Sequence, residues 1–283
     1  MKETSNPSII LQGEFGRLTL NLTARSVVEH AHAAYQFIFK AGGGDTGFKV
    51  NGSRLELTDT KAILVNPWEP HSKLDSQGKA TLALTVQVEP AWLSATLGRD
   101  APLRSRLFPK PCVALDDTVR DHVLRMGISL SAGMDATDAD REALLRDLVR
   151  SIVTAYATGE FSRQSVLPER PVDARIMRAV RLLHELSADN PHLDDIAARV
   201  GLSRSRFFEQ FKSCIGVSPQ QYLDWERMTI ATRKLANPGS SIAQVSDDLG
   251  FSAPSHFTRF FSQHIGLPPS DFKRGMLTPA PDA

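Results

Sequence analysis

The first third of the chain contains three histidines and a glutamine whose types and spacing could support ligand chemistry. His30 and His32 are separated by one residue, Gln36 follows four positions later, and His71 closes the turn Trp68-Glu-Pro-His71. On a β-strand, a His-x-His pair places both imidazoles on one face, and a later histidine can complete the group. Imidazoles bind metals, hydrogen-bond to polar ligands, or serve the fold itself.

Three hypotheses account for this group, and the sequence leaves them open. The first is a metal site with His30, His32 and His71 as candidate ligands, although the neutral amide of Gln36 binds zinc or iron less well than a carboxylate. The second is a pocket in which the three histidines, Gln36 and Trp68 bind a small-molecule effector. The third is a set of hydrogen-bonded structural histidines.

A phenylalanine-based frame occurs twice in the last third of the chain. The first copy consists of Phe207, Phe211, Ile215, Gly216, Pro219 and Tyr222. Each member recurs 50 residues later, as Phe257, Phe261, Ile265, Gly266, Pro269 and Phe272. A repeat of this length indicates one supersecondary unit used twice. Each copy has the pattern of a short helix, a glycine turn, a serine cap and a second amphipathic helix, which is a helix-turn-helix and indicates DNA binding.

The face of each second helix that lies opposite its phenylalanines is predicted to meet the major groove. In the two copies this face carries Ser205, Phe208, Glu209 and Lys212, and then Ser255, Thr258, Arg259 and Ser262. Arg259 could form a forked pair of hydrogen bonds to guanine, and Phe208 could contact a thymine methyl. Glu209 could accept from cytosine or orient a neighbouring arginine.

Residues near the ends and edges of the same helices suit phosphates, which fix register rather than sequence. They are Arg204, Arg206, Lys212 and His256, and the predicted interface also includes the two leading serines, Ser203 and Ser252. A stiff connector is predicted between the copies. It starts with the capping-box pattern Ser218-Pro219-x-Gln221 and runs to about Ala236, before Asn237-Pro238-Gly239.

The elements that must position the histidines are short strands. Arg17–Leu22 alternates apolar and polar residues, and Asn51-Gly52 between two apolar runs predicts a tight hairpin. Several such strands predict a sandwich or small barrel. Two helices should follow, because Val119, Val123, Met126 and Leu130 form one apolar stripe and Leu144, Leu148, Ile152 and Tyr156 another. These stripes either pack on the barrel or form a dimer seam.

The composition bounds the class of protein. The chain has 283 residues, a formal net charge of +1 and two distant cysteines, which suits a reducing compartment and excludes a disulfide scaffold. We find no signal peptide and no stretch long enough to span a bilayer. The expected setting is therefore the cytoplasm, with no membrane partner.

Residues 174–275 resemble the DNA-binding domain of the AraC/XylS family of bacterial transcription regulators. The resemblance rests on the run from Ile242 to Pro269, including Leu249-Gly-Phe251-Ser and Phe257-Thr-Arg259, and on Arg227 in the connector. Departures are Ala253-Pro254, where the family usually has Asp-Gln, and Ser262, where a lysine is common. Because the second copy is less basic than the family pattern, the first is predicted to supply more of the non-specific DNA affinity.

The histidine spacing resembles the cupin barrel, in which a glutamate stands at the position of Gln36. The predicted fold is therefore α+β and multidomain, with an N-terminal cupin-like β-barrel with helices and a C-terminal all-α domain of two helix-turn-helix units joined by a connector helix. The predicted divisions are a sensor barrel over 1–111, a helical packing or dimerisation segment over 112–158, a linker over 159–173, the DNA-binding domain over 174–275 and a tail over 276–283.

The sequence predicts a transcription regulator rather than an enzyme, without a cofactor. Its predicted partners are double-stranded DNA, a small-molecule effector in the barrel and, by resemblance, RNA polymerase and a second copy of the chain; the resemblance favours an activator. Two alternatives stay open. One is a metal-dependent cupin enzyme fused to a DNA-binding domain, and the other is a regulator controlled by a protein partner through an empty barrel.

Overall fold

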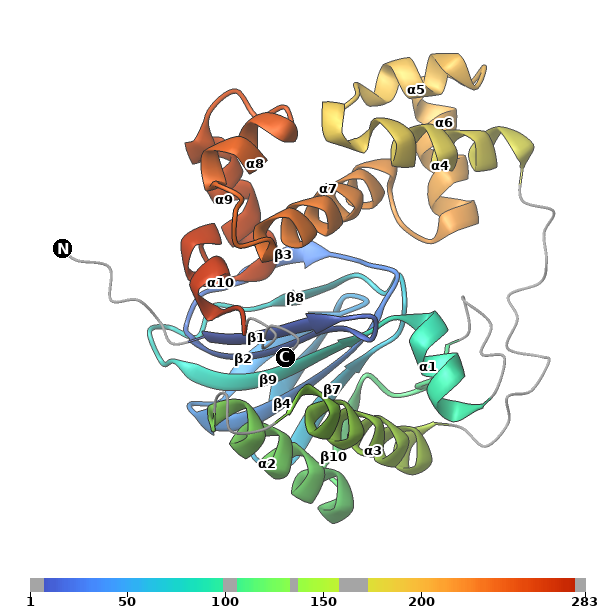
Figure 1. Ribbon diagram of the computed structural model, residues 1–283. Coiled ribbons are helices and arrows are strands. Elements are labelled where there is room, and N and C mark those ends of the chain that lie inside the picture. Colours follow the sequence, from blue (N-terminus) through green and yellow to red (C-terminus); the bar gives the residue numbers. More distant parts are fainter. Residues whose placement is uncertain (1–7, 99–105, 133–136, 158–172, 278–283) are drawn as a thin grey trace.

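The computed structural model describes residues 8–98, 106–132, 137–157 and 173–277. It has an N-terminal part of β-sheet covered by helices and a C-terminal part that is helical. The connector helix α7, Pro219–Ala236, lies across the top of the sheets (Figure 1). The predicted α+β, multidomain class is confirmed. Most of the predicted linker, residues 159–172, and the end of the predicted tail, from residue 278, lie outside the described residues.

The strands form two antiparallel sheets. The larger sheet has the order β1-β2-β9-β4-β7-β10 and the smaller one β3-β8-β5-β6. Their bounds are β1 Ser8–Gly13, β2 Gly16–Thr23, β3 Val27–His30, β4 Tyr35–Gly43, β5 Thr46–Val50, β6 Ser53–Leu57, β7 Lys61–Val65, β8 His71–Lys73, β9 Thr81–Val88 and β10 Cys112–Ala114. The division predicted at residue 112 is wrong in one respect, because Cys112 pairs with Ile63 and so β10 belongs to the larger sheet.

The hairpin predicted at Asn51-Gly52 joins β5 to β6. Both residues have positive φ angles, 48° and 81°, as the two-residue turn that matches strand twist requires. The strands pair in register from Val50 with Ser53 to Thr46 with Leu57. This turn therefore fixes which side chains of β5 face the larger sheet.

Alternation along the strands separates two apolar layers. Tyr35, Phe37 and Phe39 of β4 face a core formed with the helices, whereas Ile38 faces a smaller cluster between the sheets. The covering helices are α1 Pro90–Leu97, α2 Asp117–Ser131 and α3 Asp138–Tyr156. We call the two sheets together the barrel. The apolar stripes predicted in α2 and α3 pack on its larger sheet, since Val119 and Leu148 are fully buried in that core. Leu124 and Ile128 of α2 remain 61% exposed, so the dimer seam stays a prediction.

The C-terminal part consists of two helix-turn-helix units with separate cores. Phe207 and Phe211 are buried in the first, and Phe257 and Phe261 in the second. The elements are α4 Ala174–Leu186, a short 3-10 helix Ser187–Asp189, α5 Leu193–Arg199, α6 Arg204–Ile215, α7 Pro219–Ala236, α8 Ile242–Asp248, α9 Pro254–Ile265 and α10 Pro269–Gly275. None of the helices in the described ranges is long and apolar enough to cross a membrane.

The connector helix α7 has the predicted bounds and the predicted capping box. Ser218 Oγ accepts from the backbone N–H of Gln221, whose side chain accepts from the backbone of Ser218. Arg227 lies fully inside, donating to the backbone oxygen of Leu249 at 3.0 Å. It therefore joins α7 to the end of α8.

The barrel and the helical part interlock. Trp68 stacks on Tyr222 of α7 with ring centroids 5.4 Å apart. Ala31 is buried in the core of the first unit and Ile10 in the core of the second. The backbone N–H of Leu277 donates to the oxygen of Ile10 at 2.8 Å, so the predicted tail begins with residues held against β1.

Candidate nucleic-acid interface and effector site

In each unit a glycine with positive φ ends the first helix and turns the chain into the second. Gly201 has a φ angle of 71° and Gly250 one of 65°, a region that favours glycine. The turns lead into α6 and α9, which we call the recognition helices. Their phenylalanines point into the unit cores, so their opposite faces are left outward.

On α6 the outward face is polar and largely exposed. Ser205, Glu209 and Lys212 are exposed, as predicted. Phe208 is half-buried, because its ring packs edge-on against Phe207 and carries the Arg204 guanidinium 4.8 Å from its centroid. The other side of its ring is the one that can meet a base.

Three of the residues predicted to contact phosphate, all on α6, differ in whether an acidic side chain already balances their charge. Arg204 forms an ion pair with Asp194 at the start of α5, so part of its charge is already balanced. Arg206 is exposed and lies near Asp173. Hydrogen bonds from Arg175 lower the pKa of Asp173, and the charge of Arg206 lowers it further. Lys212, on the outward face, makes no ion pair within the described residues.

On α9 the outward face carries one strong donor. Arg259 is exposed and forms no hydrogen bond or ion pair with the residues that the structure describes. Ser255 is exposed and Thr258 half-buried, while Ser262 donates its hydroxyl to the backbone oxygen of Thr258 at 2.7 Å. Ser262 is thus already engaged within its own helix.

The serine caps predicted for the two recognition helices are not formed. Ser203 stands at the N-cap of α6, but its side chain makes no capping hydrogen bond. In the second unit the N-cap is Ala253, and Pro254 starts the helix. Ser203 and Ser252 are 49 residues apart, whereas the phenylalanines of the two copies are 50 apart, so the second copy has one extra residue after its serine. Ser252 therefore precedes the N-cap position, and its hydroxyl is hydrogen-bonded to His256 at 2.9 Å.

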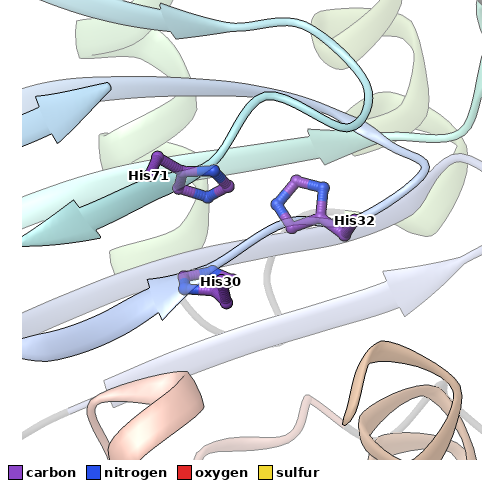
Figure 2. A group of neighbouring side chains, drawn as sticks. All are labelled: His30, His32 and His71. Carbon is purple, nitrogen blue, oxygen red and sulfur yellow. The ribbon is translucent and has the colours of Figure 1, made fainter. Parts of the chain in front are cut away.

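The three barrel histidines come together at the end of β3 and the start of β8 (Figure 2). The ring centroids of His30 and His71 lie 4.3 Å apart, and those of His32 and His71 lie 4.9 Å apart. Gln36 joins them: its Oε1 is 2.6 Å from His32 Nε2 and 3.1 Å from His71 Nε2. The structure therefore brings the three predicted histidines and Gln36 together, although β3 ends at His30 and His32 lies beyond the strand. We call these four residues the histidine cluster.

The electrostatic setting favours the neutral forms of the rings. Burial lowers the pKa of each of the three histidines, most strongly for His30 and His71. Charge on the neighbouring rings lowers the pKa of His30 and His71 further. Neutral imidazoles are the forms that bind metals or accept hydrogen bonds.

Polar side chains line the space between the two sheets, a cavity of about 100 Å³ beside the cluster. Arg17, Asn21 and Lys73 contribute to its walls, and Asn21 Oδ1 is buried without a partner among the described residues. Burial lowers the pKa of Lys73 to about 8 and that of Arg17 to about 10. Two cations in a poorly hydrated space favour a ligand with negative or electron-rich oxygen atoms.

A second cavity, of about 240 Å³, shares Arg17, His30 and His264 with this space and has walls from both parts of the chain. The barrel supplies Arg17 and His30, and the helical part supplies Trp225, Arg233 and His264. Of these residues only His30 was predicted to line an effector site. The polar residues of β2, which alternate with Leu18, Leu20 and Leu22, were the signal that could have revealed Arg17 and Asn21.

The side chain of Trp68, predicted to contact an effector, packs against α7 instead. Its ring stacks on Tyr222 and meets Trp225 edge-on at 5.1 Å. Only its backbone adjoins the cluster, where its N–H donates to the oxygen of His32. Trp68 lies at a turn, and its ring packs on aromatic residues of α7. We therefore assign it to the contact between the barrel and the helical part.

Comparison with known proteins bears on the helical part. A family profile described as a helix-turn-helix domain matches residues 196–275. The Msm operon regulatory protein of Streptococcus mutans is 30% identical over 101 residues, 36% of each chain. A putative AraC-like transcription regulator of Streptomyces lividans is 27% identical over 107 residues, 38% of this chain and 35% of that one.

The chain carries an AraC-type DNA-binding domain. The HTH-type transcriptional activator RhaS of Escherichia fergusonii is 28% identical over 159 residues, 56% of this chain and 54% of that one. These alignments span from about a third to just over half of the relatives' lengths.

The AraC-type domain and the barrel together have the fold of a solved structure. Apo ToxT K231A from Vibrio cholerae superposes with a TM-score of 0.56 over 98% of this chain and 99% of that one, at 15% sequence identity. At this identity the likeness concerns the fold alone.

Proposed function

We propose that this protein is a transcription regulator that binds a specific double-stranded DNA sequence through α6 and α9 and responds to a small molecule bound in the barrel. The observation that carries the proposal is the pair of recognition helices. Both bury two phenylalanines of the same spacing, and both leave the opposite face outward. A helix with such a face fits the major groove of B-DNA.

The two faces differ in the chemistry that they offer to DNA. Arg259 of α9 suits guanine O6 and N7, while Glu209 of α6 suits cytosine N4. Lys212 and Arg206 in the first unit and His256 in the second suit phosphates, which set register. The first unit therefore supplies more of the salt-dependent affinity, and Arg259 supplies base discrimination.

The connector gives the two helices a fixed relation. α7 is one uninterrupted helix of 18 residues, and Arg227 binds it to both units through the oxygens of Ser187 and Leu249. Two recognition helices held this way can enter successive major grooves on one face of the duplex, about 34 Å apart.

The effector acts from the barrel in this proposal. Residues of the histidine cluster and the polar wall that includes Arg17 line the two cavities, and α7 and α9 contribute further walls to the larger one. A ligand that binds one arrangement of the two parts better than the other shifts their populations, and thereby the geometry offered to DNA. Like the relatives named as activators, the protein would act as an activator that contacts RNA polymerase as a dimer.

DNA binding by the purified full chain tests the proposal. Fluorescence anisotropy with fragments selected from a random duplex pool should yield a preferred sequence, bound about 10³-fold or more tightly than random duplex at the same salt. Arg259→Ala should relax one base position of that sequence. A chain that binds every duplex equally, with and without extracts of small molecules, would refute the proposed function.

A metal-dependent enzyme fused to a DNA-binding domain is the second candidate, because the histidine cluster has the residues for it. That candidate predicts turnover of a small molecule that requires the cluster. A regulator predicts instead that occupancy of the cluster changes DNA affinity without consuming the ligand. Following candidate ligands by NMR in the presence of protein and DNA separates the two.

A further inference from the structure

In the histidine cluster each imidazole ring donates a hydrogen bond from its Nδ1 to a backbone carbonyl oxygen, which leaves its Nε2 without a proton. The Nδ1 atoms of the three histidines lie 2.8, 2.9 and 2.8 Å from the backbone oxygens of Val28, Ala34 and Glu69. A carbonyl oxygen only accepts, so each Nδ1 carries the proton and donates it. The Nε2 atom of each neutral ring therefore holds the lone pair. One ring nitrogen from each of the three histidines lies within 4.8 Å of the other two.

Two of these lone pairs face another acceptor. The Nε2 atoms of His32 and His71 lie 2.6 and 3.1 Å from Gln36 Oε1, with no proton to share. In the present orientation of the Gln36 amide, its oxygen also accepts from Gln87 Nε2 at 3.4 Å. A cation between the nitrogens and the amide oxygen satisfies all of these atoms as they stand.

The geometry suits a transition-metal ion. Zn–N bonds of about 2.0–2.1 Å place two nitrogens about 3.4 Å apart on a tetrahedral ion, so small side-chain rotations close the present spacing. Hydrogen bonds from the outer ring nitrogen to backbone carbonyls are the usual way in which proteins orient metal-bound histidines. An all-imidazole set favours ions such as Zn²⁺, Cu²⁺ or Ni²⁺ over Mg²⁺ and Ca²⁺.

A fourth imidazole approaches from the DNA-binding domain. The ring centroid of His264 in α9 is 6.4 Å from that of His30, little more than the 5.8 Å between His30 and His32. The Nδ1 of His264 donates to the oxygen of Phe260 at 2.8 Å, and its Nε2 has Asp224 Oδ2 as a distant partner at 3.9 Å, beyond hydrogen-bonding range. A Cβ at Gly266 would lie 3.0 Å from Val27 of β3, which shows how closely the end of α9 meets the strand that carries His30.

We propose that His30, His32 and His71 bind one divalent transition-metal ion, with the Gln36 oxygen beside it and His264 of α9 as a ligand from the DNA-binding domain. The ion would tie the second recognition helix to the barrel, so its occupancy biases the docking of that helix. This last consequence rests on the proposed function, whereas binding of the ion does not.

Titration of the full chain with Co²⁺ after chelation and dialysis tests the site, because Co²⁺ bound by four ligands absorbs visible light intensely. We expect one equivalent to bind. His71→Asn should weaken binding roughly tenfold or more, and Gln36→Glu should strengthen it by a similar factor because a carboxylate replaces an amide. His192→Gln, an exposed histidine at the start of α5, is the matched control and should bind as the wild type does.

The gain in Gln36→Glu guards against a misfolded variant, since misfolding does not tighten a metal site. Circular dichroism of each variant checks its fold. A wild type that binds no Co²⁺, or equal binding by the wild type and both cluster variants, overturns the metal site.

His264→Gln tests the bridge between the two parts. The variant should still bind one equivalent, but with the weaker absorption of an ion that has lost a ring nitrogen, and its DNA affinity should no longer change with metal. An unchanged spectrum overturns the role of His264. If the chain binds Co²⁺ through His264 but prefers no DNA sequence, the metal site stands and the proposed function fails. Specific DNA binding without any metal binding overturns the metal site and leaves the proposed function standing.

Discussion

Arg227 should be the most costly charged residue of the DNA-binding domain to remove. Its side chain is 2% exposed, and its guanidinium donates to the backbone oxygens of Leu249 and, at 3.5 Å, Ser187. The same group lies 4.5 Å from the ring centroid of Phe251 and 5.7 Å from that of Phe260. Arg227 thus contacts both helix-turn-helix units from the helix that joins them.

The magnitude follows from these contacts. A hydrogen bond to a charged donor contributes about 1.5–3 kcal/mol, and the longer bond to Ser187 should fall at or below the lower end. A desolvated cation over an aromatic ring adds about 0.5–2 kcal/mol. Burial lowers the pKa of Arg227, which shows that part of this gain is offset by desolvation. We expect Arg227→Ala to lower the free energy of unfolding by about 3–4 kcal/mol.

Urea unfolding followed by tryptophan fluorescence measures the change, because Trp225 lies two residues away on α7. Arg227→Lys should recover less than half of the loss, since an ammonium cannot reproduce the planar fork. Arg178→Ala, at an exposed position of α4, is the control and should change stability by less than about 0.5 kcal/mol. A loss below about 1 kcal/mol in Arg227→Ala would refute the assignment of Arg227 as the tie between the units.

The remaining predictions concern DNA and the two interfaces. Arg259→Ala should cost about 1–3 kcal/mol on the preferred DNA and little on random duplex, as measured by anisotropy. Lys212→Ala should reduce the salt slope of DNA binding by about one; an unchanged slope excludes it as a phosphate contact. Phe211→Ala should lower the free energy of unfolding by about 3–5 kcal/mol, because the ring is fully buried. Trp68→Ala should increase protease cutting between the barrel and the helical part, since it removes the stack on Tyr222; cutting at the wild-type rate would count against that stack as the main contact.

Most of the helical part could be predicted from the sequence because its signals are local. The spacing of Phe207 and Phe211 and of their repeats fixed the buried faces, and the Ser218 capping box fixed the start of α7. A single inserted residue was enough to defeat the cap prediction at Ser252, since capping depends on one position.

The site between the two parts could not be predicted in the same way. His264 meets His30 across more than 200 residues of sequence, and no periodicity records which helix packs on which strand. The short strands β3 and β8 were missed for a related reason, because three or four residues carry too little alternation to stand out. The histidines were recognised by their type, while their surroundings depended on tertiary packing.

The N-terminal part supplies one buried residue to the core of each helix-turn-helix unit, so an excised DNA-binding domain would lose both. Ile10 of β1 fills the second helix-turn-helix unit and Ala31 fills the first, both with 1% exposure or less. A polypeptide that begins at α4 would lack Ile10 and Ala31, and the apolar side chains that they cover would be exposed to water. Separation of the intact DNA-binding domain from the barrel would expose the same apolar side chains. Separation of the two parts would therefore also destabilise both helix-turn-helix units, and the two events are thermodynamically linked.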